Sequence, residues 1–302
     1  MKKRLVVLLA FVTLLMTGCT KYVKDDKKIV RNEVTGQNIV ENILCKPTLE
    51  STLEKYDEYK ISLKKVPSCD KFKITSGGYE GIWNTLFVKP LAWLILKIGY
   101  IVKNFGLAII LVTLLIRGIM FPFTQKTAQQ SELLKQIKPE LDKLEKKYQG
   151  KTDQESMMQK SQEMMLIYKK NNISPMSGCL FGFIQLPLFM AFYEALYRLP
   201  AIFEGKFLVY DLGLTPLIAI QSGKWYYTIL VVLVFVVTFF SFKLNSGASM
   251  SKEQESSMKM MRNITLVMIG TASLSVSTAI SLYWITNSTF TIIQNLIVKR
   301  SK

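Results

Sequence analysis

Long apolar segments alternate with lysine-rich polar segments along most of this chain. The apolar segments occupy residues 105–123, 175–199, 225–243, 263–275 and 276–298. The first of them would be about 30 Å long as a helix, which matches the hydrocarbon core of a bilayer. The pattern therefore predicts an all-α membrane protein with five transmembrane helices.

The last two segments come from one continuous apolar stretch, residues 264–298. Small polar residues interrupt its centre, among them Ser273, Ser275 and Thr278. A single tilted helix is the alternative, but the stretch is too long for one span. We therefore expect a tight turn near Ser275, with one short helix on either side.

Two helical elements are predicted outside the spans. Segment 82–104 mixes apolar residues with aromatic residues and lysines, which is typical of an amphipathic helix lying in the headgroup region. Segment 124–174 has apolar residues at helical spacing up to Tyr148, then Gly150, then a capping-box sequence at 152–155. This second segment predicts a helical hairpin.

The distribution of positive charge predicts the orientation of the spans. The chain has 39 basic and 22 acidic residues, for a formal net charge of +17. Lysine and arginine are concentrated in segment 124–174, in the 244–262 loop and in the 299–302 tail, whereas the 200–224 loop is balanced. The positive-inside rule therefore puts the first three in the cytoplasm and the 200–224 loop outside.

The first residues have the features of a bacterial lipoprotein signal peptide. Basic residues at positions 2–4 precede a short apolar stretch that ends close to Cys19. The residues before this cysteine resemble a lipobox, with Met16 where leucine is usual. We expect residues 1–18 to be removed and Cys19 to carry a palmitate-type lipid, which places the N-terminus outside. An ordinary signal peptide or a retained first helix is the alternative.

The polar segment 19–81 is expected to be an extracytoplasmic, lipid-anchored tail, with few aliphatic residues for a core. Cys45 and Cys69 lie within it, in what should be an oxidising compartment. A disulfide between them would contribute about 3 kcal/mol by the chain-entropy argument. The alternative is that both thiols are free and the tail is mostly disordered.

Composition argues against catalysis. The chain contains no histidine, which removes histidine-ligated metal sites, serine–histidine triads and histidine acid–base chemistry. We find no glycine-rich phosphate loop, no paired catalytic carboxylates and no CxxC motif. The basic balance alone would suit nucleic-acid binding, but 49% hydrophobic residues argue against it. We expect no enzyme activity, no cofactor, no metal and no direct readout of nucleic acid.

Arg117 is the sharpest candidate for a functional residue. It lies inside the apolar span 105–123, where a charged side chain costs roughly 2.5–3.5 kcal/mol. Snorkelling of this side chain to the interface is the alternative. Polar residues of other spans could line a hydrated cavity beside it. These residues are Gln185, Thr238, Ser241, Ser281, Tyr283, Thr286 and Asn287.

An ordered series of motifs resembles the YidC/Oxa-type membrane protein insertases, in the lipoprotein form of Gram-positive bacteria. The resemblance covers about residues 80 to 300. It is carried by FVKPLAW (87–93), GLAIILVTLLIRGIMFP (106–122), IKPELDKLEKKY (137–148), QEMMLIYKKNNISPMSGCLFGFIQLPLFMAFYEAL (162–196) and LYWITNSTFTIIQNLIVKR (282–300).

The resemblance implies a five-helix fold with a hydrophilic groove centred on Arg117. It implies that the mobile cytoplasmic hairpin receives substrates and that the family inserts proteins without nucleotide hydrolysis by the insertase. Gln185 and Trp284 match the family's motifs, and we expect them to line the groove together with the polar residues Ser241, Tyr283 and Asn287. The implied partners are nascent membrane proteins, membrane lipids, the Sec translocon and the ribosome. The implied location is the bacterial cell membrane.

Two positions depart from the family's pattern. Ser241 and Phe242 stand where glutamine is expected near the end of the third span, and Ser275 to Thr278 replace a proline–glycine turn. They bear on the polarity of the groove and the shape of the last turn.

The rival function is a small transporter or channel, but such folds show repeated halves, and we find no internal repeat. A lipoprotein whose 19–81 tail is the functional binding module is a third reading.

Overall fold

The computed structural model describes residues 20–173, 177–245 and 252–300. The predicted signal peptide 1–18 and the lipidation site Cys19 lie outside the described residues. The chain divides into two compact units. One comprises the chain up to Leu115 with Leu186–Val234 and Ala272–Thr286, and the other comprises Ile116–Gln185, Phe235–Thr271 and Asn287–Lys302.

Long helices dominate the described chain, and five of them contribute residues to both units. They are α4 (Phe105–Gln136), α7 (Ser177–Tyr197), α10 (Thr228–Asn245), α11 (Lys252–Ser275) and α12 (Thr278–Arg300). The break between α11 and α12 lies at the turn expected near Ser275. Residues 275–278 form this break without the proline–glycine turn that the resemblance implies.

Three stretches of the described residues are long and apolar enough to cross a membrane: Asn84–Val102, Phe105–Gln136 and Trp225–Leu244. The first of them is the segment predicted to lie along the membrane surface. It consists of a π-helical turn, η3 (Asn84–Val88), followed by α3 (Lys89–Val102). Hydropathy alone does not distinguish a helix that spans the membrane from one that lies along its surface, because an apolar helix with aromatic residues and lysines is compatible with both.

A tight corner joins α3 to α4. Lys103 ends α3 in the left-handed conformation (φ 54°), and the Asn104 side chain caps α4 by accepting a hydrogen bond from the Leu107 amide at 2.9 Å. Gly99 is required here, because a Cβ atom at this position would lie 2.3 Å from the Phe105 ring. The corner therefore fixes where the α4 span begins.

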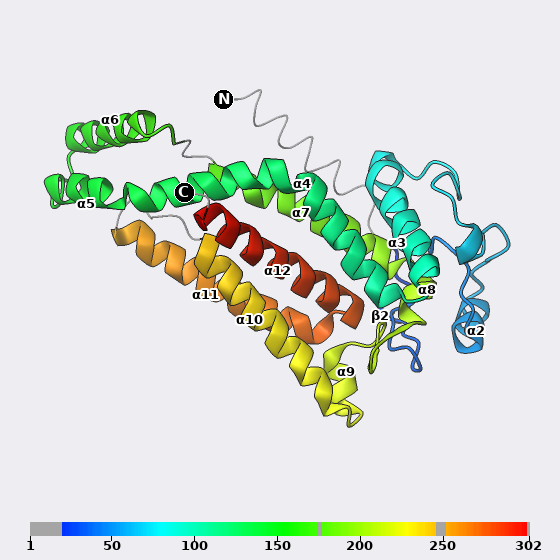
Figure 1. The fold of residues 1–302 in the computed structure, drawn as a ribbon. Helices are drawn as coiled ribbons and strands as arrows, with labels where there is room; N and C mark the ends of the chain where they lie inside the picture. The colour runs from blue at the N-terminus through cyan, green and yellow to red at the C-terminus, as the bar shows by residue number, and fades with distance from the viewer. Residues whose placement is uncertain (1–19, 174–176, 246–251, 301–302) are drawn as a thin grey trace. The chain divides into compact units, whose positions relative to one another are not determined.

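The predicted hairpin is present in the second unit, with different helix ends from those expected. Helix α4 runs without a break from the apolar span through to Gln136, and α5 (Lys138–Lys147) begins with Pro139 in its first turn. Proline is tolerated there because the first amides of a helix need no internal acceptor. Helix α6 (Gln154–Lys170) returns beside α5 (Figure 1). Leu141 and Tyr168 pack in the core between the arms.

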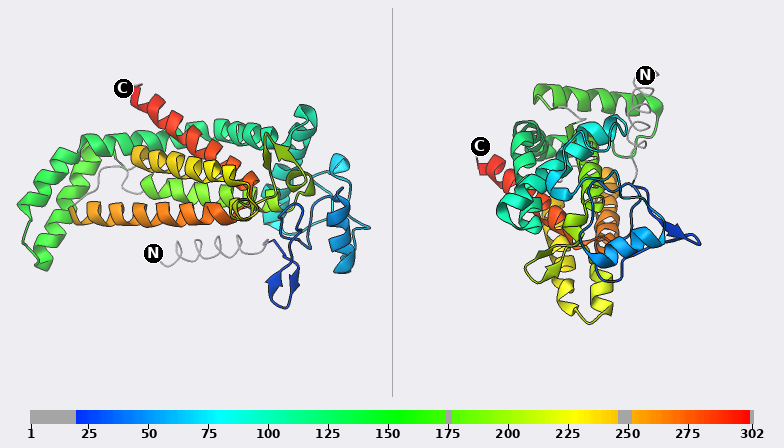
Figure 2. Two further views of the ribbon diagram at one scale, coloured as in Figure 1. Left: turned by 90° about the horizontal axis from the view of Figure 1, so that it is seen from below. Right: turned by 90° about the vertical axis from the view of Figure 1, so that its right-hand side faces the viewer.

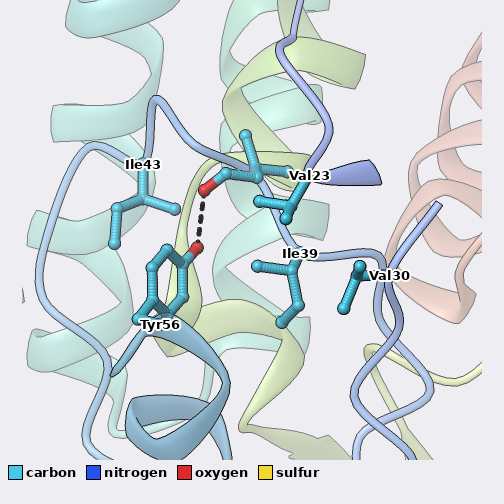
Figure 3. Packing of buried hydrophobic residues seen from close by; sticks show 6 residues of the cluster. Val23, Val30, Ile39, Ile43 and Tyr56 are labelled. Atoms are coloured by element: carbon cyan, nitrogen blue, oxygen red, sulfur yellow. Dashed lines mark hydrogen bonds between the residues drawn. The ribbon is translucent and has the colours of Figure 1, made fainter. Parts of the chain in front are cut away.

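The N-terminal segment is folded, which differs from the expected tail with little core. Its elements are the β1–β2 hairpin (Lys24–Asp25 and Lys28–Ile29, the dark blue arrows of Figure 2), α2 (Glu50–Glu58) and the short turn η2 (Cys69–Lys71). Tyr56 packs against Val23, Val30, Ile39, Val40 and Ile43, and its hydroxyl donates to the Val40 carbonyl at 2.7 Å (Figure 3). A disulfide joins Cys45 to Cys69. One tyrosine and a crosslink therefore compensate for the scarcity of aliphatic residues.

The remaining elements of the first unit lie between α7 and α10. They are α8 (Pro200–Phe203), β3 (Lys206–Phe207), β4 (Tyr210–Asp211), α9 (Pro216–Gln221) and the turn η4 (Trp225–Tyr227). Strands β3 and β4 pair antiparallel, with Phe207 opposite Tyr210. The Thr278 amide donates to the Leu214 carbonyl and the Ala279 amide to the Leu212 carbonyl, both at 3.0 Å. These bonds attach the start of α12 to this connection.

Candidate functional site: a buried arginine and a polar seam

Arg117 is buried in the second unit, with 2% of its surface exposed. Its Nε donates to Oδ1 of Asn287 on α12 and its Nη2 donates to Oε1 of Gln185 on α7, each at 2.6 Å. The acceptors in these two bonds are neutral amide oxygens, which orient the guanidinium. Donor groups on a charged side chain make stronger hydrogen bonds than neutral ones. Three helices are therefore joined through one arginine.

The arginine belongs to a polar seam that runs along two helices of the second unit. On α4 the buried polar residues Arg117, Thr124, Thr127 and Ser131 follow helical spacing. On α12 the buried polar residues Asn287, Ser288, Thr291 and Gln294 do the same. The Gln294 side-chain amide donates to the Thr124 hydroxyl at 2.7 Å, so the two rows meet at a second point.

Sequence reasoning missed this second contact. Thr124 follows the predicted span 105–123, and Gln294 lies in the predicted span 276–298 but is not among the polar residues expected beside Arg117. The signal was present, because Asn287, Thr291 and Gln294 are spaced four and three residues apart, and residues so spaced share one helix face. Polar residues that repeat at this spacing within an apolar helix predict a buried polar face.

Two candidate residues of α10 also lie in the second unit. Thr238 is 3% exposed, and its hydroxyl has no hydrogen-bond partner among the described residues. Ser241, one helical turn further on, is half-buried. Their hydroxyls add polarity to a helix that is otherwise apolar.

Tyr283 and Trp284 belong to the first unit, where they form part of an aromatic cluster. The Tyr283 ring stacks on Phe192 with centroids 4.3 Å apart, and Trp284 lies 5.6 Å from the Phe189 ring. Ser281 is buried in the same unit. These contacts give the two aromatic residues a packing function between α12 and α7, whatever further part they have in binding.

The first unit contains a second buried charge that sequence reasoning did not single out. Arg198, at the end of α7, is fully buried and donates to the Asn42 carbonyl, to Oδ1 of Asn84 and to Oε2 of Glu80, each at 2.6 Å. Its carbonyl accepts from the Leu44 amide at 2.9 Å. Arg198 therefore holds the folded N-terminal segment to the end of α7 within the first unit. Its partners lie more than a hundred residues away in sequence, so no local pattern reveals them.

Buried acid and amine groups surround this arginine. Lys89 is fully buried and donates from Nζ to the carbonyls of Ser76 and Gly78, at 2.8 and 2.6 Å. Glu194 is 2% exposed and accepts from the Trp83 indole at 3.1 Å.

Within the part of the chain that the structure describes, no group of three His, Cys, Asp or Glu side chains is placed to hold a metal ion.

Residues 97–302 match the protein family described as 60Kd inner membrane protein. The chain belongs to this family. It is 34% identical over 226 residues to the membrane protein insertase YidC of Oceanobacillus iheyensis, a match that covers 73% of this chain and 85% of the relative. It is 38% identical over 218 residues to the YidC of Alkalihalophilus pseudofirmus, covering 71% and 81%. MisCA of Bacillus subtilis, also named a membrane protein insertase, is 35% identical over 218 residues, covering 72% and 79%.

The fold of this family member is shared with a solved structure. The crystal structure of an active YidC insertase superposes with a TM-score of 0.51 at 22% identity, covering 82% of this chain. This chain spans about half the length of that protein, 52%. The family match begins at residue 97, so the folded segment around Tyr56 and the Cys45–Cys69 disulfide lies before it.

Proposed function

We propose that this family member is a membrane protein insertase of the bacterial cell membrane. The observation that carries the proposal is Arg117, buried and oriented by Gln185 and Asn287 in a chain whose relatives are named membrane protein insertases. Burial of this charge is costly, and buried charges inside membrane segments usually have a functional reason. Arg117 is the centre of a hydrophilic groove that receives the polar parts of client proteins.

The mechanism is electrostatic. A polar or acidic client segment loses hydration when it leaves water, which costs several kcal/mol for a charged group without a partner. A fixed positive charge in a medium of low dielectric constant reduces that cost, since attraction between charges is stronger there. The buried hydroxyls of Thr124, Thr127 and Ser131 continue the polar face of α4 beyond Arg117. No bond is made or broken, so the protein acts without enzyme chemistry.

The proposed topology has five spans: 105–123, 175–199, 225–243, 263–275 and 276–298. The N-terminus is outside, lipid-anchored through Cys19, and the α5–α6 hairpin and the C-terminus are in the cytoplasm. The helix comprising η3 and α3 lies along the outer membrane surface. Two observations support this arrangement: the concentration of lysines in the hairpin and the tail, and the apolar helices α4 and α10.

The proposed partners follow from the same arrangement. Nascent membrane proteins enter from the cytoplasm, either alone or with the Sec translocon and the ribosome. Serine at position 241 makes the groove less polar at this point than a glutamine would. Tyr283 and Trp284 of α12 are further proposed groove residues, as the family resemblance of residues 282–300 suggests.

An insertion assay with paired clients tests the proposal. Purified protein in liposomes receives two small clients that differ only in acidic residues of the translocated segment. Arg117→Ala should impair insertion of the acidic client and affect the neutral one less. Arg117→Lys should retain much of the activity, because a point charge survives although the forked donor geometry is lost.

Arg262→Ala is the matched control, because Arg262 is an arginine of the second unit that bonds only to its neighbour Asn263 among the contacts described here. It should insert both clients at the wild-type level. Wild-type insertion of both clients by Arg117→Ala would show that Arg117 only snorkels to the interface. Adding purified Sec translocon to the same liposomes separates independent from assisted insertion.

A further inference from the structure

The turn between β3 and β4 exposes two large apolar side chains. Phe207 pairs with Tyr210, so Leu208 and Val209 form a two-residue hairpin turn. Leu208 is 78% exposed and Val209 is 64% exposed. Their exposure is not explained by a membrane span, because the turn lies in the connection between α7 and α10.

The turn geometry does not favour these residues. Leu208 has a φ of 53°, in the left-handed region where a side chain with a Cβ atom is disfavoured. Two-residue hairpin turns with positive φ usually contain asparagine, aspartate or glycine. A leucine–valine pair is therefore unfavourable in the backbone of this turn and unfavourable when exposed to water. Both side chains would be more stable in contact with an apolar environment outside the chain.

The base of the hairpin is fixed to the beginning of the α4 span. A Cβ atom at Gly106 would lie 2.4 Å from Cβ of Phe207, so the strand packs directly on the helix backbone. The side-chain amide of Asn104 also donates to the Lys206 carbonyl at 3.4 Å. Because α4 is long and apolar enough to cross a membrane, a hairpin attached to its first turn would lie where that span leaves the bilayer.

Aromatic and basic residues near the hairpin fit the same level. The Tyr210 ring lies 5.7 Å from Tyr226 and 5.0 Å from Tyr227, at the beginning of the Trp225–Leu244 candidate span. Trp225 is 72% exposed. Lys206 and Lys224 both pair with Asp211, at 3.3 and 2.8 Å. Tryptophan, tyrosine and lysine at the end of a span are typical of the headgroup region.

We propose that Leu208 and Val209 insert into the boundary between headgroups and acyl chains, so that the β3–β4 hairpin is a lipid anchor for the connection between α7 and α10. Contiguous exposed apolar side chains are typical of contacts with membranes or proteins, and attachment to the first turn of α4 favours the membrane. The assignment to the outer leaflet rests on the proposed function and its topology. The insertion of the hairpin tip into lipid does not depend on the proposed function.

The test measures the environment of the hairpin tip in the full-length protein. A polarity-sensitive fluorophore is attached to Leu208→Cys, with Cys19 and Cys179 replaced by serine and the Cys45–Cys69 disulfide retained, in liposomes of phosphatidylethanolamine and phosphatidylglycerol. Emission should shift to the blue, with quenching by lipids brominated on their acyl chains and protection from aqueous iodide. Lys60→Cys is the matched control, because Lys60 is exposed and has nearly the same backbone conformation (φ 54°). Its label should be quenched by iodide and not by bromolipid.

A second variant separates apolar anchoring from the turn itself. Leu208→Asn suits the left-handed backbone better than leucine, so the hairpin should stay folded. With the fluorophore on Val209→Cys, Leu208→Asn should shift the emission to the red and restore iodide quenching. Unchanged emission would show that the apolar tip does not hold the hairpin in lipid.

Iodide quenching at position 208 without bromolipid quenching would overturn the proposal, since the tip would then lie in water. Protection from both quenchers would also overturn it, because a protein surface would then cover the tip. Client insertion is measured in the same liposomes. If the label is in lipid but no client inserts, the proposed function fails and the anchor stands. If clients insert while the label is in water, only the anchor fails.

Discussion

The side-chain amide of Gln294 on α12 donates a hydrogen bond to the hydroxyl of Thr124 on α4, and both residues are buried. The two residues are 170 positions apart in the sequence. The Thr124 hydroxyl also lies 3.2 Å from the Met120 and Phe121 carbonyls, so it donates within its own helix while it accepts from Gln294. The pair therefore fixes the register of α12 against α4 within the second unit.

The first prediction concerns this pair. Gln294→Leu and Thr124→Val should each destabilise the protein, and the double variant should lose less than the sum. Coupling between polar partners in membrane helices averages about 0.6 kcal/mol, so we expect a coupling free energy of this order. The measurement is a double-mutant cycle of unfolding in detergent. Thr265→Val is the control, since the Thr265 hydroxyl bonds to the Met261 carbonyl of its own helix. A coupling free energy of zero would show that the contact does not stabilise the packing of these helices.

The second prediction separates the charge of Arg117 from its hydrogen bonds. Asn287→Asp keeps an oxygen acceptor 2.6 Å from the arginine Nε and adds a negative charge. The resulting ion pair should cancel the positive charge offered to clients, so insertion of acidic clients should fall as it does in Arg117→Ala. Asn287→Ala removes the bond and keeps the charge, and it should have a smaller effect on those clients. Equal insertion by the two variants in the liposome assay would contradict a mechanism based on charge.

The third prediction concerns the Cys45–Cys69 disulfide, which closes a loop with a sequence separation of 24. Replacing both cysteines with serine should destabilise the N-terminal segment by about 3 kcal/mol, since the unfolded chain gains entropy. Hydrogen exchange of residues 20–78 should therefore become faster, with little change in the α5–α6 hairpin. Dithiothreitol should reproduce the effect in the wild-type protein and add nothing in the double variant. Slow exchange that persists after reduction would show that the segment does not depend on the crosslink.

The fourth prediction is a pH dependence of the α5–α6 hairpin. Lys147 and Tyr148 donate to Glu163 at 2.6 and 2.8 Å, and these bonds hold the pKa of the glutamate below its usual range. A lowered pKa stabilises the hairpin above the pKa of an unfolded glutamate, about 4.3, and the stabilisation is lost as the pH falls through the folded value. Fluorescence transfer between labels on the two arms should therefore decrease below about pH 4. The effect should be small, because the groups are exposed. Glu163→Gln should remove this pH dependence, and a transition of unchanged size in that variant would assign it to another group.

The helix pattern could be predicted from the sequence more completely than the contacts. The turn at Ser275 follows from small polar residues in an apolar stretch, and the hairpin arms follow from apolar spacing and the capping-box sequence 152–155. The residue that caps α6 is Asp153, which accepts from the Ser156 amide, one position later than the box predicts. The end of α4 at Gln136 was not predicted, because a change in polarity at residue 123 marks the end of an apolar span and not the end of a helix. The periodicity of apolar residues indicates which side chains are buried, and a change in that pattern does not by itself end a helix.

The Cys45–Cys69 disulfide was predicted, but the folded core of the N-terminal segment was not, and the reason is physical. Its core depends on Tyr56 and a crosslink, and its attachment depends on Arg198, Glu204 and Gln37, which make contacts more than 150 residues away. Contacts of such separation leave no local periodicity in a sequence. At the candidate site, Gln185 and Asn287 were among several polar residues considered for Arg117. Only the structure selects them, because several side chains in the spans have suitable chemistry.

The attachment of the N-terminal segment to Arg198 also sets an order of events during synthesis. Asn42 precedes its partner Arg198 by 156 residues. At ribosomal rates of about 5–20 residues per second, the arginine is made roughly 8 to 30 seconds later. The local core around Tyr56 can close within this interval, since its members lie between Val23 and Tyr56. The segment can therefore fold before α7 has been translated. A ribosome stalled before codon 198 should carry a chain whose N-terminal core is closed and whose docking surface is still open to a protease.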